Sequence, residues 1–436
     1  DGSIYEGDTI SGIWHGQGKY ILANGDKYEG DFFEWQLTGK GIFTWADGDK
    51  YEGDFINGNR SGKGIFNWAD GDKYEGEFLT IKDGGRQFQV FMHGKGKLYR
   101  YEEGKWFSGY WKDDDLEESV LLLENSALQN KRITNSEGAE IACTKNKFLL
   151  MASNSLTQEF EKTHSDYIVA VLAENSKSME REYDYKSKVF YNELGDFEKI
   201  GKEVSQNAIK KLNSRKLKTC KSDVIFDSKV SSSLLRNLFS ASNAQSIIKG
   251  ISFLKDKMNN KVFNDQISII DDPLMPKKLR SKISDCEGIQ SKKKFLIEKG
   301  YLKFFFNSLS SAKQIKHEPS GHATRSASSI PSVSYSNLYM ENGEVSKLDM
   351  IKSLKKGLLI TELMGSSINY SNGDYSRGAS GFWIENGEIC YPVSEITIAG
   401  NLVDIFMSLI PANDLEFNFG INAPSCLVEN LTLGGK

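Results

Sequence analysis

Aromatic and small residues alternate along the first quarter of the chain in a pattern that returns every 23 residues. The segment YEGDFINGNRSGKGIFNWADGDK begins at Tyr51, and close copies begin at Tyr5 and Tyr28. Within this unit, Phe66 and Trp68 lie two residues apart, which places their rings on one face of a strand. A single hairpin cannot bury such a face by itself. The pattern therefore predicts stacked β-hairpins that form one all-β array.

Turn residues and glycines within the unit support this prediction. Asn57-Gly58 is a dipeptide that accepts the positive φ angles of a two-residue turn. Gly53 and Gly64 have no side chain, so they leave room for an aromatic ring to lie across the backbone. A fourth and longer unit begins at Tyr74, and a fifth, partial unit follows it.

After the repeats, the apolar positions change to helical spacing. Asp196 is a helix cap in the segment DFEKIGKEVSQNAIKKLNSRK, and it precedes a stripe formed by Ile200, Val204, Ala208 and Leu212. This spacing predicts an amphipathic helix with one buried face.

Further elements indicate a mixture of helices and strands. Residues 233–258 are predicted to form one or two helices, and residues 348–356 another. Residues 294–306 read as a hairpin with its turn at Glu-Lys-Gly, whereas the serines and prolines of residues 319–336 indicate a loop. The predicted fold is multidomain: an all-β hairpin-repeat sheet in residues 1–115, followed by an α+β region.

The charge is distributed unevenly along the chain. Residues 1–115 contain 14 Lys and Arg against 21 Asp and Glu, whereas the remainder contains 41 against 38. An acidic first segment is repelled by anionic lipid and by nucleic acid, so we expect neither as a partner. Basic residues between 210 and 218 lack interleaved aromatic residues and are interpreted as a solvated helix face.

Cysteine usage and hydropathy indicate a cytoplasmic protein. The five cysteines show no CxxC spacing, which is typical of free thiols in a reducing compartment. No apolar run reaches membrane-spanning length, and no signal peptide is recognisable. The chain opens at Asp1 inside a repeat, so we expect the natural N-terminus to lie further upstream.

The repeated unit resembles the MORN repeat. The matching features are YEG(D/E)F, then GxGxF/Y, then DGD, in register over residues 5–111. The resemblance implies protein scaffolding, self-association and, in some proteins, phospholipid contact. With the acidic charge of this segment, we expect contact with a protein partner or self-association.

Residues 127–436 resemble the TldE (PmbA) branch of the TldD/PmbA family. The resemblance is carried by GDYSRGASGFWIENGE and YPVSEITIAGNL (within 373–402), by RKLKTCKSDVIFD (215–227), by SGHA (320–323) and by PSCLVENLTLGG (424–435). It implies a non-catalytic subunit of a metallopeptidase complex that acts on unstructured peptides. It also implies that a TldD-like catalytic partner holds the zinc, and that this chain needs no cofactor.

The resemblance also divides the chain and exposes a departure from the family. It implies a truncated N-terminal α/β part in residues 116–225 and a β-rich C-terminal domain in residues 226–436. MORN repeats replace the rest of the family's N-terminal portion, and the join falls between Lys112 and Leu121. We therefore expect strand edges that lack their usual partners.

The segment HEPSGH offers an alternative metal site. His317, Glu318 and His322 match the string HExxxH, and Cys426 or Cys286 would be the third protein ligand of a zinc ion. On this interpretation the chain is a self-sufficient metallopeptidase. The other interpretation is that His322 belongs to the family's (S/T)GHA loop and that His317 is incidental.

Position within the family favours the second interpretation. In TldD the metal motif lies upstream of a D-x-E-G turn, which here is residues 285–288, whereas HEPSGH lies downstream of it. The expected metal region, residues 235–250, contains no histidine. A third hypothesis is a scaffold protein with a degenerate peptidase-like region.

The segment GDYSRG is the remaining candidate site. Asp374, Tyr375, Ser376, Arg377 and Gly378 are predicted to form a turn at a strand edge that binds peptide main chain or supports the partner's site. No nearby histidine could act as a base for Ser376, so a nucleophilic role is not indicated. His322 is assigned the same substrate-binding or supporting role.

Overall fold

The computed structural model describes residues 2–83, 87–100, 105–111, 114–151, 157–326 and 329–435. The chain divides into two compact units, Asp1–Ser119 and Val120–Lys436. The predicted join between Lys112 and Leu121 lies partly outside the described residues, since residues 112 and 113 are not among them.

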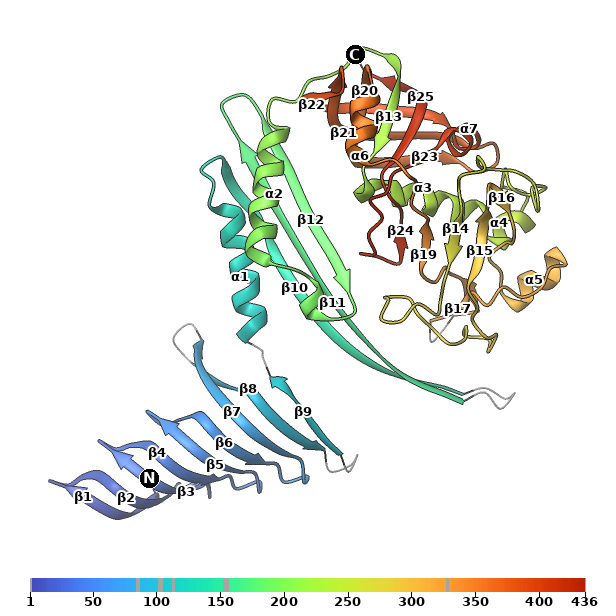
Figure 1. The fold of residues 1–436 in the computed structure, drawn as a ribbon. Helices are drawn as coiled ribbons and strands as arrows, with labels where there is room; N and C mark the ends of the chain where they lie inside the picture. Colours follow the sequence, from blue (N-terminus) through green and yellow to red (C-terminus); the bar gives the residue numbers. More distant parts are fainter. Residues whose placement is uncertain are drawn as a thin grey trace. The chain divides into compact units, whose positions relative to one another are not determined.

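The first unit is a single antiparallel sheet in which each strand pairs with the next one along the chain, as Figure 1 shows in blue. The predicted hairpin array is therefore confirmed. Its strands are β1 (Ile4–Ile10), β2 (Ile13–Ile21), β3 (Lys27–Phe33), β4 (Gln36–Thr44), β5 (Lys50–Ile56), β6 (Asn59–Asn67), β7 (Lys73–Asp83), β8 (Gln87–Arg100) and β9 (Lys105–Trp111).

The turn and glycine predictions hold in atomic detail. Asn57 and Gly58 have φ angles of 47° and 82° between β5 and β6, as a two-residue hairpin turn requires. A Cβ atom at Gly64 would lie 2.5 Å from the hydroxyl oxygen of Tyr51, because that ring crosses the glycine backbone. Gly53 faces the same hydroxyl at 2.5 Å. Both positions consequently exclude any larger residue.

Aromatic rings link one repeat to the next. The ring of Tyr51 is fully buried and meets Phe55 of its own unit and Phe78 of the following unit, both edge-to-face. Such contacts contribute about 0.5–1.5 kcal/mol beyond the area they bury. The core of the array is thus continuous across units.

Carboxylates also connect neighbouring repeats. Asp26 Oδ1 accepts a hydrogen bond of 2.9 Å from the backbone N–H of Ala46, and Asp49 Oδ1 accepts one of the same length from Ala69. Both bonds span 20 residues, so each unit supplies an acceptor for the turn of the next.

The second unit begins with an α+β part. Helix α1 (Asp114–Leu128) starts before the boundary of the unit, and three antiparallel strands follow in the order β10 (Ile133–Met151), β11 (Thr157–Glu174) and β12 (Met179–Lys188). A short 3₁₀ helix (Tyr191–Glu193) leads to α2 (Phe197–Lys211), which packs on β11 and β12.

Helix α2 agrees with its prediction. Asp196 caps it by accepting a hydrogen bond of 3.1 Å from the N–H of Lys199. The stripe of Ile200, Val204 and Ala208 is buried, as is Leu212 at the C-cap. These side chains form one core with Tyr167, Val169 and Val171 of β11.

The remainder of the unit contains two sheets. In the larger one, β13 (Cys220–Phe226), β20 (Lys356–Asn369), β21 (Asp374–Glu385), β22 (Glu388–Asn401) and β25 (Cys426–Gly434) pair in that order, and β25 pairs back to β13, so the sheet closes on itself. The short strand β23 (Ile410–Pro411) also pairs with β25. Figure 1 shows most of this sheet in orange and red.

The second sheet has the order β16 (Tyr301–Leu302), β15 (Lys294–Glu298), β14 (Ile269–Asp271), β19 (Leu338–Met340) and β24 (Ile421–Asn422). Two further short strands, β17 (Ala323–Thr324) and β18 (Ser332–Val333), pair with each other. The helices are α3 (Ser228–Ala241), α4 (Ala244–Ile248), α5 (Leu309–Ile315), α6 (Lys347–Ser353) and α7 (Leu402–Ser408). The two sheets share one hydrophobic core.

The element predictions for this region are mostly correct. The 294–306 hairpin is confirmed as β15 and β16, with positive φ angles at Lys299 and Gly300. Residues 233–258 do contain two helices, but the second one ends at Ile248 and turns follow it. Asn243 separates the two helices because its side chain caps the N-terminus of α4.

Candidate functional site

The HEPSGH segment is not helical and its residues face different surroundings. Helix α5 ends at Ile315, before the motif begins, and Lys316 adopts a left-handed conformation with φ 58°. His317 and Glu318 are exposed, whereas His322 is buried. The ring of His317 lies edge-on against Phe305 at the surface. The structure therefore does not gather the three motif residues around one point.

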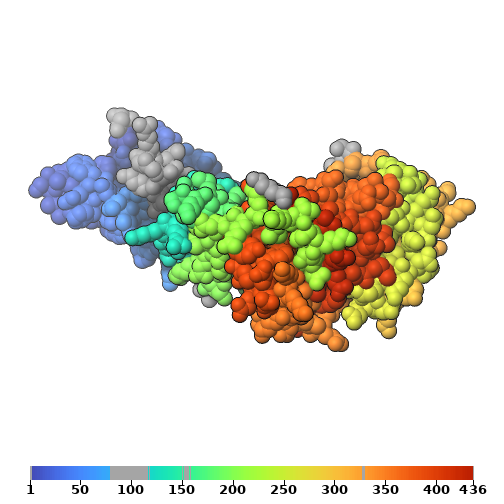
Figure 2. Space-filling view, turned by 90° about the horizontal axis from the view of Figure 1, so that it is seen from above, coloured from blue at the N-terminus to red at the C-terminus, as the bar shows by residue number. Residues whose placement is uncertain are grey.

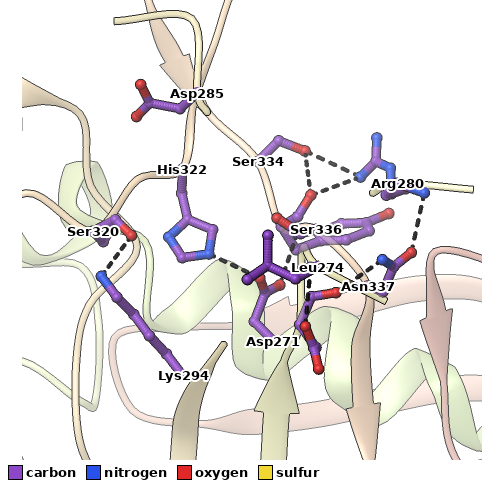
Figure 3. A network of polar contacts seen from close by, with 12 residues as sticks. Asp271, Leu274, Arg280, Asp285, Lys294, Ser320, His322, Ser334, Ser336 and Asn337 are labelled. Carbon is purple, nitrogen blue, oxygen red and sulfur yellow. Dashed lines mark hydrogen bonds and ion pairs between the residues drawn. The ribbon is translucent and has the colours of Figure 1, made fainter. Parts of the chain in front are cut away.

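His322 instead belongs to a buried polar network, drawn in Figure 3. Its Nε2 lies 3.0 Å from Oδ1 of Asp271, at the end of β14. The other carboxylate oxygen of Asp271 accepts a hydrogen bond of 2.7 Å from the backbone N–H of Ser336. The imidazole stacks on Phe304 and meets Phe306 edge-to-face. These contacts fix the ring, so His322 supports the loop from within.

The D-x-E-G turn is coupled to the same loop. Asp285 Oδ1 accepts hydrogen bonds from the N–H groups of Glu287 and Ile289, and its Oδ2 accepts one from Ala323. Glu287 in turn accepts a hydrogen bond of 2.7 Å from the N–H of Leu309, at the start of α5. Both carboxylates of this turn therefore cap backbone N–H groups, which is a structural role.

The two cysteines considered as further ligands are poor metal donors as they stand. Cys426 is fully buried, and its thiol donates to the carbonyl oxygen of Pro424 at 3.2 Å. Burial raises the thiol pKa of Cys426, and burial with the charges of Asp285 and Glu287 raises that of Cys286. Metals bind the thiolate, so both shifts oppose binding.

The donor groups needed for a zinc site do not converge. Within the part of the chain that the structure describes, no three side chains among His, Cys, Asp and Glu are disposed to hold a metal ion. Residues 235–250 form the end of α3 and all of α4, and their sequence contains no His, Cys, Asp or Glu. The described residues therefore do not fit the zinc site that the family implies.

The GDYSRG segment lies in the interior of the closed sheet. Strand β21 pairs with β22 at every position of Asp374–Gly378, and with β20 at each of them except Arg377, where the register shifts. The prediction of a strand-edge turn is wrong, because both backbone edges are already hydrogen-bonded. A substrate main chain cannot add to this strand.

The GDYSRG side chains mainly stabilise their surroundings. Asp374 accepts a hydrogen bond of 2.7 Å from the side-chain amide of Asn372, and Arg377 donates one of 2.8 Å from Nε to the carbonyl oxygen of Gly365. Tyr375 is buried in the core, and burial raises the pKa of its hydroxyl. Ser376 and Gly378 are half-buried.

A polar cleft that the sequence did not reveal separates β12 and α2 from the closed sheet. Its volume is about 610 Å³. Lys211 of α2 bridges it, with Nζ 2.6 Å from Glu182 of β12 and 2.9 Å from Glu362 of β20. Interpreting all the basic residues near 210 as a solvated helix face was therefore wrong for Lys211. Figure 2 shows the green surface of this region meeting the orange and red surface of the C-terminal sheet.

These features define an α+β protein with a closed sheet at its C-terminus and hairpin repeats at its N-terminus. Family models agree: the MORN repeat matches residues 5–27, 28–50 and 51–73, the PmbA/TldA metallopeptidase central domain matches residues 109–212, and the corresponding C-terminal domain matches residues 219–435. The chain belongs to the PmbA/TldA metallopeptidase family.

Individual relatives give the same result. Metalloprotease PmbA of Escherichia coli O157:H7 is 33% identical over 325 residues, which is 74% of this chain and 70% of the relative. The PmbA homolog of Buchnera aphidicola subsp. Acyrthosiphon pisum is 30% identical over 318 residues, or 72% and 69% of the two chains.

Solved structures share the fold. TldE from Thermococcus kodakarensis superposes with a TM-score of 0.68 at 22% identity, covering 82% of this chain and 78% of the other. A Thermotoga maritima protein described as a candidate modulator of a DNA gyrase gives 0.68 at 24% identity, covering 90% of each chain. Among the described residues, no helix is long and apolar enough to cross a membrane.

Proposed function

We propose that this chain is a non-catalytic TldE/PmbA-like subunit of a metallopeptidase complex that acts on unstructured peptides. The observation that carries the proposal is the composition of residues 235–250, where the family's metal motif is expected and where no His, Cys, Asp or Glu occurs. The zinc would then be held by a TldD-like partner in the cytoplasm. The five free cysteines agree with a reducing compartment.

In this role the chain contributes shape and support to the partner's site. Arg377 donates a hydrogen bond to the carbonyl oxygen of Gly365, and Asp374 accepts one from Asn372, so together they stabilise the turn of the β20–β21 hairpin and the strand segments next to it. The SGHA loop is held by the contact of His322 with Asp271 and by the hydrogen bond that Asp285 accepts from Ala323. A rigid scaffold of this kind positions groups without taking part in bond breaking.

The MORN array is proposed to contact a protein. Ile10, Phe33 and Ile56 occupy equivalent positions of successive units, and all three are more than half exposed. A regular row of exposed apolar side chains favours protein contact. The same observation supports the second candidate function, a scaffold whose peptidase-like region has no role in proteolysis.

The deciding experiment measures zinc per chain and cleavage of an unfolded peptide. The full chain, a TldD-like protein and their mixture are compared. A metal-free, inactive chain that increases cleavage by the TldD-like protein supports the proposal. No effect on the partner supports the scaffold. Stoichiometric zinc and cleavage by the isolated chain, both lost in His317→Ala, would overturn both, and that exposed residue can be replaced without disturbing the core.

A further inference from the structure

The first half of strand β11 has an open backbone edge. β11 pairs with β10 from Thr157 to Ala173, but with β12 only from Ser165 onward. Within the described residues, the side of β11 opposite β10 therefore has no strand partner between Thr157 and His164. An open edge of this kind presents N–H and C=O groups that another extended chain can pair with.

A groove of about 740 Å³ runs along this edge. Residues 157 and 159–163 form one wall, and the segment 273–284, except Arg280, forms another. The groove is therefore lined by five consecutive residues of the unpaired part of β11, from Glu159 to Thr163. Both the open edge and the groove belong to the second compact unit.

Large apolar side chains are exposed in the groove. Leu274 is 56% exposed and Ile283 is 67% exposed, and Phe190 also presents its ring to solvent. Phe160 stacks on Phe148 across the β10–β11 pair. Covering such surfaces contributes about 25 cal/mol for each Å² removed from water. These side chains favour a ligand with bulky apolar residues.

Four lysines surround the apolar surface. Lys162, Lys277, Lys278 and Lys282 line the groove, and none of them forms an ion pair with a carboxylate of the described residues. Lys277 and Lys278 lie over the rings of Phe190 and Phe417 respectively.

The two acidic side chains of the groove are already engaged. Glu159 lies 2.9 Å from Lys147, and Glu161 lies 3.1 Å from Lys145, both on β10. The positive charge of the groove lysines is therefore not balanced within the groove. Burial lowers the pKa of Lys162, and it lowers that of Lys282 although the charges of Asp271 and Asp285 act in the opposite direction, so an incoming anion would stabilise both ammonium groups.

The wall formed by residues 273–284 is held in place before any ligand arrives (Figure 3). Arg280 donates from its backbone N–H to Oδ1 of Asn337 at 3.0 Å, and from Nη1 to Ser334 at 3.1 Å. Asn337 in turn donates to the carbonyl oxygen of Asp272 at 2.9 Å. A fixed wall lowers the entropy lost on binding.

We propose that this groove binds an extended segment of another protein in which acidic side chains alternate with large apolar ones. The segment adds to β11 as a strand, its carboxylates face the lysines and its apolar side chains cover Leu274 and Ile283. A segment that carries both kinds of side chain suits the site because lysines and exposed apolar side chains are interspersed between Leu274 and Ile283. This proposal does not depend on the proposed function, because the groove is formed by this chain alone and requires no TldD-like partner.

The test uses the full chain and fluorescent twelve-residue peptides in which Glu alternates with Leu and Phe. Anisotropy is expected to show saturable binding that weakens at least tenfold when Gln replaces Glu, and that is lost when Lys replaces Glu. A peptide methylated at alternate backbone nitrogens should also bind at least tenfold more weakly, because it cannot pair with β11. Equal binding of the Glu and Gln peptides, or no saturable binding, overturns the proposal.

Protein variants locate the binding. The double variant Lys277→Glu, Lys278→Glu should weaken binding at least tenfold, and Ile283→Ser about fivefold. Lys292→Glu, Lys293→Glu is the matched control, because it reverses two adjacent exposed lysines outside the groove. Circular dichroism confirms that each variant is folded.

Two further results would also contradict the proposal. One is competition by a single-stranded oligonucleotide at concentrations equal to the peptide, which would indicate a site for polyanions in general. The other is self-association that disappears in the Lys277→Glu, Lys278→Glu variant, measured by sedimentation, which would make a second copy of this chain the occupant.

Discussion

The imidazole of His322 and the carboxylate of Asp271 face one another at 3.0 Å, and their residues are 1% and 0% exposed. The pair joins the SGHA loop to the end of β14, two segments that lie 51 residues apart in the chain. Any change that removes one member leaves the other buried without its partner.

We expect His322→Ala to lower the free energy of unfolding by about 2–4 kcal/mol, because it leaves a cavity between Phe304 and Phe306 and deprives Asp271 of a partner. Urea unfolding measures the change. His317→Ala is the control and should cost less than about 0.5 kcal/mol, since His317 is exposed. Equal effects of the two substitutions would contradict a structural role for His322.

The ion triad formed by Lys211, Glu182 and Glu362 should be equally sensitive to the loss of one member. Lys211→Met leaves the carboxylates of Glu182 and Glu362 close together and largely out of contact with water. We therefore expect the free energy of unfolding to fall by about 3–5 kcal/mol. Lys210→Met is the matched control, because the neighbouring side chain is exposed. A loss below about 1 kcal/mol in Lys211→Met would indicate that water screens the triad.

The same triad predicts a dependence on pH. Burial lowers the pKa of Lys211, but attraction and hydrogen bonds from Glu182 and Glu362 outweigh it and raise the pKa above the ordinary 10.5. The stabilisation is therefore complete below pH 10.5 and is lost as the pH rises through the higher value of the folded state. The stability difference between wild type and Lys211→Met should shrink in that alkaline range. A stability difference that does not change as the pH passes through this alkaline range would argue against a raised pKa of Lys211.

Two glycines of the closed sheet should respond differently to alanine. A Cβ at Gly381 would overlap the carbonyl oxygen of Leu359, and we expect a loss of about 3 kcal/mol or more. At Gly378 the nearest atom is the carbonyl oxygen of Met364 at 3.3 Å, so a small shift suffices and the loss should stay near 1 kcal/mol. Thermal unfolding of both variants checks the order. Gly378→Ala then serves to test whether this segment supports a partner's activity.

In the repeats, Gly64→Ala places a methyl group against the ring of Tyr51 and should destabilise the array by about 2–3 kcal/mol. Lys63→Ala alters an exposed neighbour on the same strand and should have little effect. Limited proteolysis within residues 1–83 reports the change locally. Unaltered cleavage rates in Gly64→Ala would show that the array tolerates the methyl group.

The repeats could be predicted from the sequence because their information is local. Every hairpin contains its own turn, its own aromatic pair and the glycines that accommodate them, so periodicity alone specifies the pairing. Helix α2 was predictable for the same reason, from Asp196 and the stripe that follows it. Neither prediction needed knowledge of distant segments.

The site was less accessible because its contacts connect distant parts of the chain. Nothing near His322 in the sequence indicates Asp271, and nothing near Lys211 indicates Glu362. The sequence predicts a strand edge at GDYSRG because a single strand does not reveal how many neighbours it has. The open edge of β11 is hidden in the same way, since it depends on where β12 stops.

The hydrogen bonds that Asp26 accepts from Ala46 and Asp49 accepts from Ala69 make the repeats of the N-terminal sheet interchangeable units. Each unit offers the same acceptor and requires the same donor, so a duplicated or deleted unit of 23 residues leaves every remaining bond intact. Gene duplication can therefore lengthen or shorten this sheet in whole steps without redesigning its core. The number of repeats can therefore change in evolution independently of the peptidase-like fold.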